Sequence, residues 1–158
     1  MKVRVGFGYD VHRLVKGLPF ALGGITIKHT KGSLGHSDGD VLIHAICDAL
    51  LGAANLRDIG YHFSDTSEEF EGIDSKILLK KTYDLILEKG FKLQNIDATI
   101  CLQSPKINNS IPEMKSTLAS TMNVGEDDIS IKATTTERMG FIGAEDGVSA
   151  YTVVLISK

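Results

Sequence analysis

The stretch VRVGFGYDVH, residues 3–12, places an apolar residue at every second position. This alternation predicts a β-strand with two unlike faces, because successive side chains of a strand point to opposite sides. One face would carry Val3, Val5, Phe7, Tyr9 and Val11. The other face would carry Gly6, Gly8, Asp10 and His12. Asp10 and His12 would therefore project together from the side of the strand that its glycines occupy.

Turn and capping signals mark the ends of further elements along the chain. The glycines at positions 23 and 24 predict a β-hairpin. An N-cap at Asp74 and a glycine at position 90 bound one helix, and Ser110 with Pro112 begins another. The expected elements are a hairpin over 19–28, helices over 41–56, 74–89 and 110–122, and strands over 91–103, 129–133 and 147–156.

The last expected strand is apolar on both faces over its second half, so both faces need to be covered. Three helices can shield one face of a mixed sheet of four or five strands, and the chain offers no further layer for the other face. We therefore expect that face to associate with further copies of the chain. The alternative is that a long loop covers it. No repeat or linker divides residues 1–158, which we interpret as a single domain.

The composition excludes several classes of protein. The chain has 158 residues, 42% of them hydrophobic and 23% charged, with a net charge of −3. No apolar run approaches the roughly 18 residues of a transmembrane helix, so no membrane partner is expected. The slight acidity and the lack of a basic stripe argue against binding to nucleic acid. Two unclustered cysteines favour the reducing cytoplasm, and an organellar origin after removal of a transit peptide stays open.

The strand over residues 3–12 offers part of a metal site. Asp10 and His12 share a strand face, and His44 on the following helix could complete a set of three ligands. One carboxylate and two imidazoles suit Zn²⁺ with one coordination position left open, which is the catalytic arrangement. The alternative is that His44 pairs with Asp40 or Asp48, each four residues away on the same helix.

A second polar group, HSDGD at residues 36–40, precedes that helix. The start of a helix presents free N–H groups and the positive end of the helix dipole, so His36 and Ser37 could bind phosphate there. The alternative is an ordinary cap, in which Ser37 and Asp40 form a capping box.

A third polar group, TTTE at residues 134–137, lies at the end of an expected strand. Its three hydroxyls could bind phosphate oxygens and Glu137 could hold a second hard cation such as Mg²⁺, or the threonines could simply reflect β-propensity. The turn at 104–106 could contact the edge of a small base or be a plain loop. The long loop 57–73 favours a lid or binding flap.

Four segments occur in a fixed order: GYDVH, GHSDGDVLIHAICDALLGAANLRDIGYHFSDT, QSPKI and KATTTERMGFIG. Together they resemble the 2-C-methyl-D-erythritol 2,4-cyclodiphosphate synthases of the non-mevalonate isoprenoid pathway, essentially from end to end. The resemblance implies α+β, ferredoxin-like subunits that form a homotrimer, with sheets packed around the trimer axis and active sites between subunits. It also implies a phosphorus–oxygen lyase. The 2-phosphate of 4-diphosphocytidyl-2-C-methyl-D-erythritol 2-phosphate would attack the β-phosphate of the same molecule, closing the cyclodiphosphate ring and releasing CMP.

The resemblance also implies roles for individual residues. The implied metal ligands are Asp10, His12 and His44 for one Zn²⁺ per subunit, and Glu137 for Mg²⁺ or Mn²⁺. The implied catalytic residues, which stabilise the transition state, are His36 and Thr135. The implied substrate-binding residues are Ser37, Asp58, Gly60, Phe63, Ser64, Asp65, Thr66, Ser67, Leu102, Gln103, Ser104, Pro105, Lys106, Ile107, Asn108, Thr134, Thr136 and Phe141.

One position departs from the family pattern. After GFIG the family commonly has arginine, whereas this chain has Ala144. The departure argues against a phosphate contact at this position and against an isoprenoid diphosphate in a cavity along the trimer axis. The residues alone leave two other functions open. One is a phosphohydrolase that uses the same Zn²⁺ to activate water, and the other is a non-catalytic trimeric binding protein in which His12 and His44 are structural.

Overall fold

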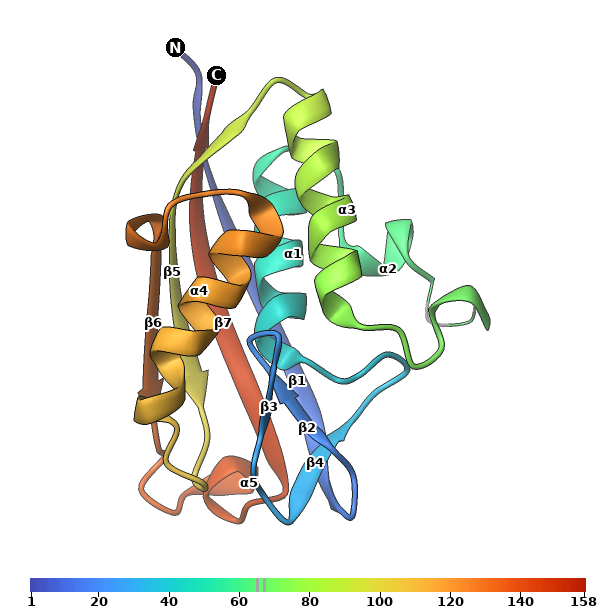
Figure 1. Ribbon diagram of the computed structural model, residues 1–158, viewed down its shortest axis with the longest axis vertical. Coiled ribbons are helices and arrows are strands. Elements are labelled where there is room, and N and C mark those ends of the chain that lie inside the picture. The colour runs from blue at the N-terminus through green and yellow to red at the C-terminus, as the bar shows by residue number, and fades with distance from the viewer. Residues whose placement is uncertain (65, 67) are drawn as a thin grey trace.

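The long antiparallel pair of β1 (Val3–Lys16) and β7 (Gly147–Ser157) forms the centre of the fold (Figure 1). β1 continues four residues beyond the strand predicted from the alternation over residues 3–12. The two chain ends lie side by side at one end of this pair, because Lys2 and Lys158 exchange backbone hydrogen bonds.

The computed structural model describes residues 1–64, 66 and 68–158. Within these residues β1 and β7 belong to a sheet of five strands in the order β4-β1-β7-β5-β6. The other members are β4 (Lys31–Leu34), β5 (Lys92–Cys101) and β6 (Ile129–Thr134). β5 and β6 run parallel and the other neighbours are antiparallel. The predicted α+β class with a mixed sheet is confirmed.

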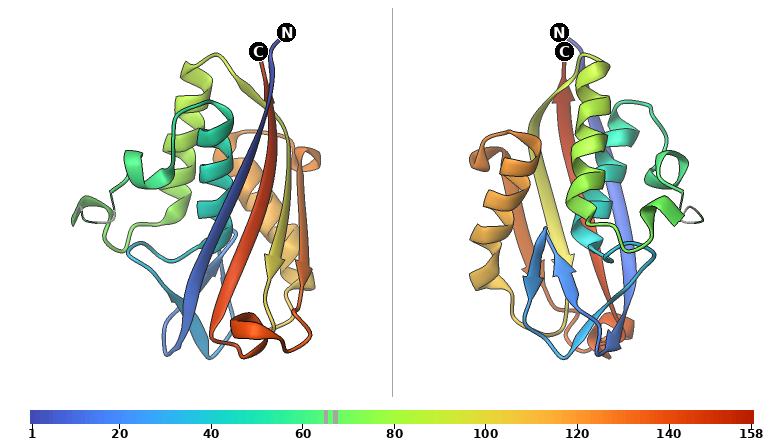
Figure 2. Two further views of the ribbon diagram at one scale, coloured as in Figure 1. Left: turned by 180° about the vertical axis from the view of Figure 1, so that it is seen from behind. Right: turned by 45° about the vertical axis from the view of Figure 1, so that its right-hand side comes forward.

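The longer helices lie together on one face of this sheet, as predicted, and Figure 2 shows from behind the face that they leave open. They are α1 (Val41–Ala53), α3 (Ser75–Glu88) and α4 (Ile111–Met122). The shorter elements are α2 (Ile59–His62), α5 (Gly140–Gly143), the 3-10 turns η1 (Glu68–Phe70), η2 (Asn108–Ser110) and η3 (Glu126–Asp128), and the hairpin strands β2 (Phe20–Leu22) and β3 (Ile25–Ile27). No described helix is long and apolar enough to cross a membrane.

Two glycines of β1 allow α1 to lie directly against the sheet. A Cβ atom at Gly6 would lie 1.9 Å from the carbonyl oxygen of Ala49, and one at Gly8 would lie 1.9 Å from that of Ala45. Real side chains do not approach a backbone oxygen so closely, so only glycine fits at both positions. The glycine face of β1 therefore lies under α1, and Asp10 and His12 lie on that same face.

The opposite face of the sheet stays open. The side chains of Val5 and Phe7 on β1 are 67% and 62% exposed, and Tyr151 and Val153 on β7 are 42% and 44% exposed. On the helix side, by contrast, alternate residues of β7 are fully buried. β7 is thus apolar on both faces, as predicted. The alternative in which a long loop covers the second face is wrong over Tyr151 and Val153.

The start of α1 differs from the sequence-based expectation. The N-cap is Asp40, whose carboxylate accepts the N–H of Ile43 at 3.0 Å, so the predicted capping box with Ser37 is wrong. The same carboxylate also accepts the N–H groups of Gly23 and Gly24 at 2.9 and 2.7 Å. Burial raises the pKa of Asp40, although three N–H groups donate to it. This aspartate fastens the β2–β3 hairpin to the helix.

Two other boundaries also differ. The helix predicted to reach residue 56 ends at Ala53, with Ala54 as its C-cap. The sequence predicts a long loop over 57–73, but this segment contains α2 and η1.

Replacing Gly8 by alanine should lower the free energy of unfolding, because the new methyl group would force α1 away from β1. Such overpacking costs about 1–3 kcal/mol. Gly52→Ala in α1 is the matched control, because no atom lies within 4 Å of a Cβ there. This control should raise the stability by up to about 1 kcal/mol. Urea unfolding at one protein concentration measures both changes, and equal stabilities of the two variants would contradict the close approach.

Candidate functional site

Asp10, His12 and His44, called the triad below, come together between β1 and the first turn of α1. Asp10 and His12 lie two residues apart on β1, and His44 directly precedes the alanine whose carbonyl approaches Gly8. Asp10 Oδ2 lies 2.9 Å from His12 Nε2 and 3.1 Å from His44 Nδ1. The two nitrogens lie 3.1 Å apart. The structure therefore places the three predicted metal ligands at one point.

The alternative in which His44 pairs with an aspartate of its own helix is wrong. Asp40 accepts backbone N–H groups, as described above, and Asp48 accepts a backbone N–H of α2 at 2.8 Å. The Nδ1 atom of His44 faces the other two triad residues, Asp10 and His12. Its Nε2 lies 3.0 Å from the hydroxyl of Ser37 and 2.9 Å from that of Ser75.

The position of the proton on His12 follows from its backbone contact. Its Nδ1 lies 3.1 Å from the carbonyl oxygen of Leu34. A carbonyl oxygen can only accept, so Nδ1 carries a proton and the neutral ring presents the lone pair of Nε2 to the triad. Metal-bound histidines commonly donate their second N–H to such an acceptor.

The triad has a strong internal electrostatic coupling. Burial alone would raise the pKa of Asp10, but the hydrogen bonds and positive charges that His12 and His44 offer when their rings are protonated outweigh it and lower the pKa to about 2. Burial alone would lower the pKa of His12, but the carboxylate of Asp10 raises it. Asp10 is therefore an anion at neutral pH, and its position favours a cation between the three side chains.

The spacing of the triad fits a metal ion. One ligand atom from each residue lies within 4.8 Å of the other two. Ligand atoms 2.0–2.1 Å from a tetrahedral Zn²⁺ are about 3.3 Å apart, so the observed separations would need to grow by only a few tenths of an ångström. The donor set of one carboxylate and two imidazoles can hold a metal ion and still leave one position open.

A pocket of about 290 Å³ lies beside the triad. Its lining residues are His12, His36, Ser37, His44, Ile59, Gly60, Phe63, Phe70 and Leu78. The structure thus brings the predicted residues His36, Ser37, Gly60 and Phe63 to the two histidines of the triad. The rings of Phe63 and Phe70 pack edge to face at 5.6 Å. The segment 57–73 therefore supplies one wall of the pocket.

Other predicted residues of that segment lie outside the lining. Asp58 is the N-cap of α2 and accepts the N–H of Tyr61 at 2.8 Å. The hydroxyls of Ser64 and Thr66 lie 2.8 Å apart. The remaining two predicted substrate-binding residues, Asp65 and Ser67, lie outside the described residues.

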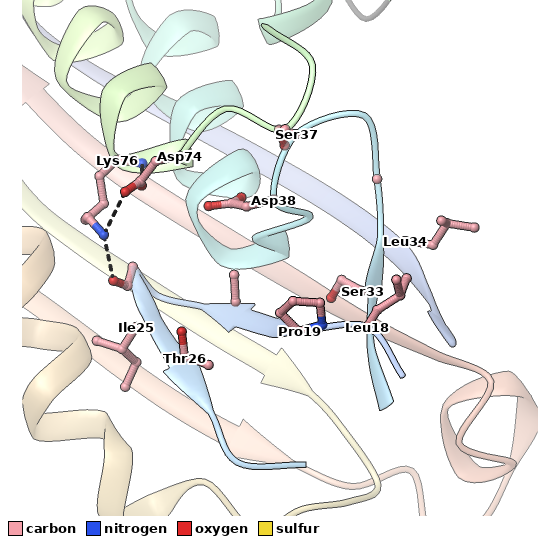
Figure 3. A pocket seen from close by; sticks show the side chains of 14 residues that line it. Leu18, Pro19, Ile25, Thr26, Ser33, Leu34, Ser37, Asp38, Asp74 and Lys76 are labelled. Atoms are coloured by element: carbon pink, nitrogen blue, oxygen red, sulfur yellow. Dashed lines mark hydrogen bonds and ion pairs between the residues drawn. The ribbon is translucent and has the colours of Figure 1, made fainter. Parts of the chain in front are cut away.

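A larger cavity, about 500 Å³, lies between the β2–β3 hairpin and the start of α3 (Figure 3). It shares Ser37 with the pocket beside the triad, but no triad side chain lines it. At its edge Lys76 Nζ donates to the carbonyl oxygen of Gly24 at 3.1 Å and pairs with Asp74 at 3.0 Å.

A second group of predicted residues gathers at the far ends of β5 and β6. A pocket of about 190 Å³ is lined by Leu102, Gln103, Pro105, Lys106, Ile107, Asn108, Ala133, Thr134 and Thr135. Beside it, Glu137 Oε1 accepts the hydroxyl of Thr135 at 3.3 Å. The hydroxyl of Thr136 donates to the carbonyl oxygen of Met139 at 2.7 Å. The predicted base-binding turn and phosphate-binding threonines are thus neighbours.

Phe141 and Ser104 belong to neither of these two pockets. Phe141 lies in α5 and lines the pockets beside Tyr9. Ser104 is adjacent in sequence to the lining residues Gln103 and Pro105.

Strand register places the two groups on opposite faces of the sheet. Residues paired across neighbouring strands form a row and point to the same face of the sheet. Asp10, Ala150 and Ile100 form one such row, on the helix side. Thr134 belongs to the next row, which reaches Val11 on the open side. Neighbouring rows point to opposite faces. A single chain therefore does not join the triad to Thr134.

Comparison with known proteins identifies the family of this chain. The sequence model of the YgbB family matches residues 3–157. The chain belongs to the YgbB family. One relative, the 2-C-methyl-D-erythritol 2,4-cyclodiphosphate synthase of Bacteroides thetaiotaomicron, is 63% identical over 158 residues, which are 100% of this chain and 99% of the relative.

Solved YgbB-like structures share the fold. The bifunctional IspDF from Campylobacter jejuni is 43% identical with a TM-score of 0.95, and the match covers 98% of this chain and 42% of that one. A 2C-methyl-D-erythritol-2,4-cyclodiphosphate synthase in a CDP-bound form is 36% identical with a TM-score of 0.90, over 98% of this chain and 100% of that one.

In this member of the YgbB family, sequence reasoning missed two residues near the triad. Ser75 and Asp38 stand behind His44, and Ser75 is 31 positions away from it in sequence. Ser75 follows the N-cap Asp74, so its residue type is that of an ordinary first helical turn. No local pattern could have assigned it to the site.

Replacing His44 by alanine should weaken the binding of divalent metal ions, because one of three ligands is lost while the fold is kept. The measurement is a Zn²⁺ titration against a chromophoric chelator, with the bound metal counted after dialysis. His29→Ala, which removes an imidazole outside the triad, is the control and should keep the affinity. Full Zn²⁺ occupancy of the His44 variant would rule out the triad as the binding site.

Proposed function

We propose that this chain converts 4-diphosphocytidyl-2-C-methyl-D-erythritol 2-phosphate into 2-C-methyl-D-erythritol 2,4-cyclodiphosphate and CMP. An oxygen of the 2-phosphate forms a bond to the β-phosphorus. The bond from the β-phosphorus to the oxygen shared with the α-phosphate breaks, and CMP leaves with that oxygen. Nucleophile and electrophile belong to one molecule, so this phosphorus–oxygen lyase needs no nucleophile from the protein.

One observation carries the proposal. The pocket beside the triad joins two candidate metal ligands to His36 and Ser37, in a chain 63% identical to a protein named for this product. Holding both reacting groups of the substrate in the right geometry can contribute about 7–11 kcal/mol to catalysis. Positioning and electrostatic stabilisation are therefore the tasks left to the side chains.

In this proposal Asp10, His12 and His44 hold one Zn²⁺ per subunit. When bound, Zn²⁺ polarises a phosphate oxygen of the substrate. Asp10 contributes its negative charge, and His12 contributes the Nε2 lone pair left free by its bond to the Leu34 carbonyl. His36 and the hydroxyl of Ser37, on the same pocket wall, donate hydrogen bonds to phosphate oxygens as negative charge redistributes in the transition state.

The pocket beside the triad is too small for the whole substrate. Its volume of about 290 Å³ lies at the lower end of ligand sites, and the substrate carries a cytidine, a diphosphate and a phosphorylated erythritol. We assign the remaining contacts to a second copy of the chain. There, residues 102–108 would frame cytosine, Thr134–Thr136 would bind phosphate oxygens, and Glu137 would hold Mg²⁺ or Mn²⁺.

The open face of the sheet is the surface through which such copies would meet. Val5, Phe7, Tyr151 and Val153 form an exposed apolar area on the two central strands. Three copies arranged around an axis would bury this apolar area. Thr134 and its neighbours in one subunit would then lie beside the triad of the next subunit. The proposed assembly is a homotrimer with three sites between subunits.

The remaining expectations belong to the same proposal. Residues 1–158 would act as one catalytic domain in the cytoplasm, with the cytidyl diphosphate substrate and two further copies of the chain as partners. A net charge of −3 gives no attraction to nucleic acid, so cations in the site would offset the charge of the substrate.

Incubating the purified chain with the substrate, Zn²⁺ and Mg²⁺ should produce CMP and cyclodiphosphate in equal amounts. The two products are measured by ³¹P NMR. Inorganic phosphate in their place would identify a phosphohydrolase. No turnover, together with a melting temperature unaltered by chelator, would identify a non-catalytic binding protein.

Co-expressing two inactive variants, so that they assemble into mixed trimers, should restore part of the activity if each site takes its halves from different subunits. His44→Ala lacks the triad half and Glu137→Gln lacks the other half. Random co-assembly after co-expression leaves about one site in four with both halves intact, so about a quarter of the wild-type turnover is expected. The two variants assembled separately and then assayed together are the control. No recovery in co-assembled trimers would place both halves in one subunit.

A further inference from the structure

Ser75, the first residue of α3, is fully buried and stands directly behind His44. Its Oγ lies 2.9 Å from His44 Nε2, on the side of the ring away from the triad. The same Oγ lies 2.5 Å from Asp38 Oδ1, and the N–H of Ser75 donates to Asp38 Oδ2 at 2.9 Å. In Figure 3 the carboxylate of Asp38 is drawn in front of α1 and points toward Asp74 at the start of α3.

The number of available protons decides which group donates in the hydrogen bond between Ser75 Oγ and His44 Nε2. The carboxylate of Asp38 only accepts hydrogen bonds, and it lies within reach of both the N–H and the O–H of Ser75. Ser75 has one hydroxyl proton, which it donates to Asp38. Its oxygen can then only accept from His44, so Nε2 of His44 carries a proton. The Nδ1 lone pair of the neutral ring is left for the triad.

Ser37 also lies near His44 Nε2, at 3.0 Å, but its situation differs. Ser37 is half-buried and lines the pocket, where its hydroxyl is assigned to substrate phosphate. Ser75 has no exposed surface, and its hydroxyl is committed to Asp38. The contact from Ser75 therefore persists when the pocket is occupied.

We propose that Ser75 is a positioning residue for the metal ligand His44, with Asp38 orienting the Ser75 hydroxyl. The chain of contacts from Asp38 through Ser75 to His44 fixes both the plane of the imidazole and the nitrogen that faces the metal. This inference rests on the proposed metal site of the triad. It adds two residues that do not touch the ion.

The chain of contacts also connects the metal site to the loop that carries His36. Backbone bonds join Asp38 N–H to the carbonyl of Ile73 at 3.1 Å and Gly72 N–H to the carbonyl of His36 at 2.8 Å. The end of the segment 57–73 is thus fastened to the loop 36–38. Ser75 orients His44 from a part of the chain that also holds the pocket wall in place.

The test compares Ser75→Ala and Asp38→Asn with Ser33→Ala. Ser33 is a suitable control because its hydroxyl is also buried but has no hydrogen-bond partner among the described residues. Ser75→Ala removes the acceptor for His44 Nε2–H. In Asp38→Asn the amide can donate to Ser75, which lets the serine donate to His44 and favours the opposite tautomer.

Affinity for Zn²⁺, measured by competition with a chromophoric chelator, should fall about 10–100-fold in both test variants, the usual cost of losing such a contact. Ser33→Ala should bind Zn²⁺ like the wild type. An affinity within about twofold of the wild type for both Ser75→Ala and Asp38→Asn would overturn the proposal.

A second readout needs no metal and separates this inference from the proposed function. In ¹⁵N-labelled, metal-free wild-type protein, His44 Nε2 should show a slowly exchanging proton, which Ser75→Ala should lose or exchange faster. An unprotonated Nε2 in the wild type would overturn the inference. If Nε2 is protonated but the wild type binds no Zn²⁺ and forms no cyclodiphosphate, the metal site and the proposed function fail while the hydrogen-bond chain stands.

Discussion

The contact of α1 with β1 at Gly6 and Gly8 is the constraint on which the rest of the structure depends. Because both positions lack a Cβ, backbone carbonyl oxygens of α1 can lie directly against the backbone of β1. That closeness sets the height of His44 above the sheet, and it lets the imidazole reach the two β1 side chains just beyond the glycines. The candidate metal ligands are thus positioned where helix and strand pack most closely.

The sequence predicts what local patterns determine. Alternation over residues 3–12 identifies the central strand and the shared face of Asp10 and His12, and the residues alone suggest His44 as the third ligand. Helix ends are less determined locally: Ser37 has the residue type of a cap, but Asp40 caps α1 because it also binds the turn of a distant hairpin. Tertiary contacts decide between two plausible caps.

Other features of the site have no local signal. Ser75 reaches His44 only because α3 begins beside α1, and periodicity cannot reveal that placement. The family resemblance groups Thr134 with the triad residues, but strand register puts their side chains on opposite faces of one sheet. That separation depends on which strands pair, and pairing is a long-range property of the fold.

The pairing of the two chain ends has a consequence for how the fold can be combined with others. Val3 lies beside the C-terminus, and His12 is about 30 Å farther along β1 at the usual rise of a strand. Polypeptide fused at either end would leave the molecule far from the triad. This geometry offers a physical reason why the same architecture can match 42% of a longer protein, the bifunctional IspDF from Campylobacter jejuni.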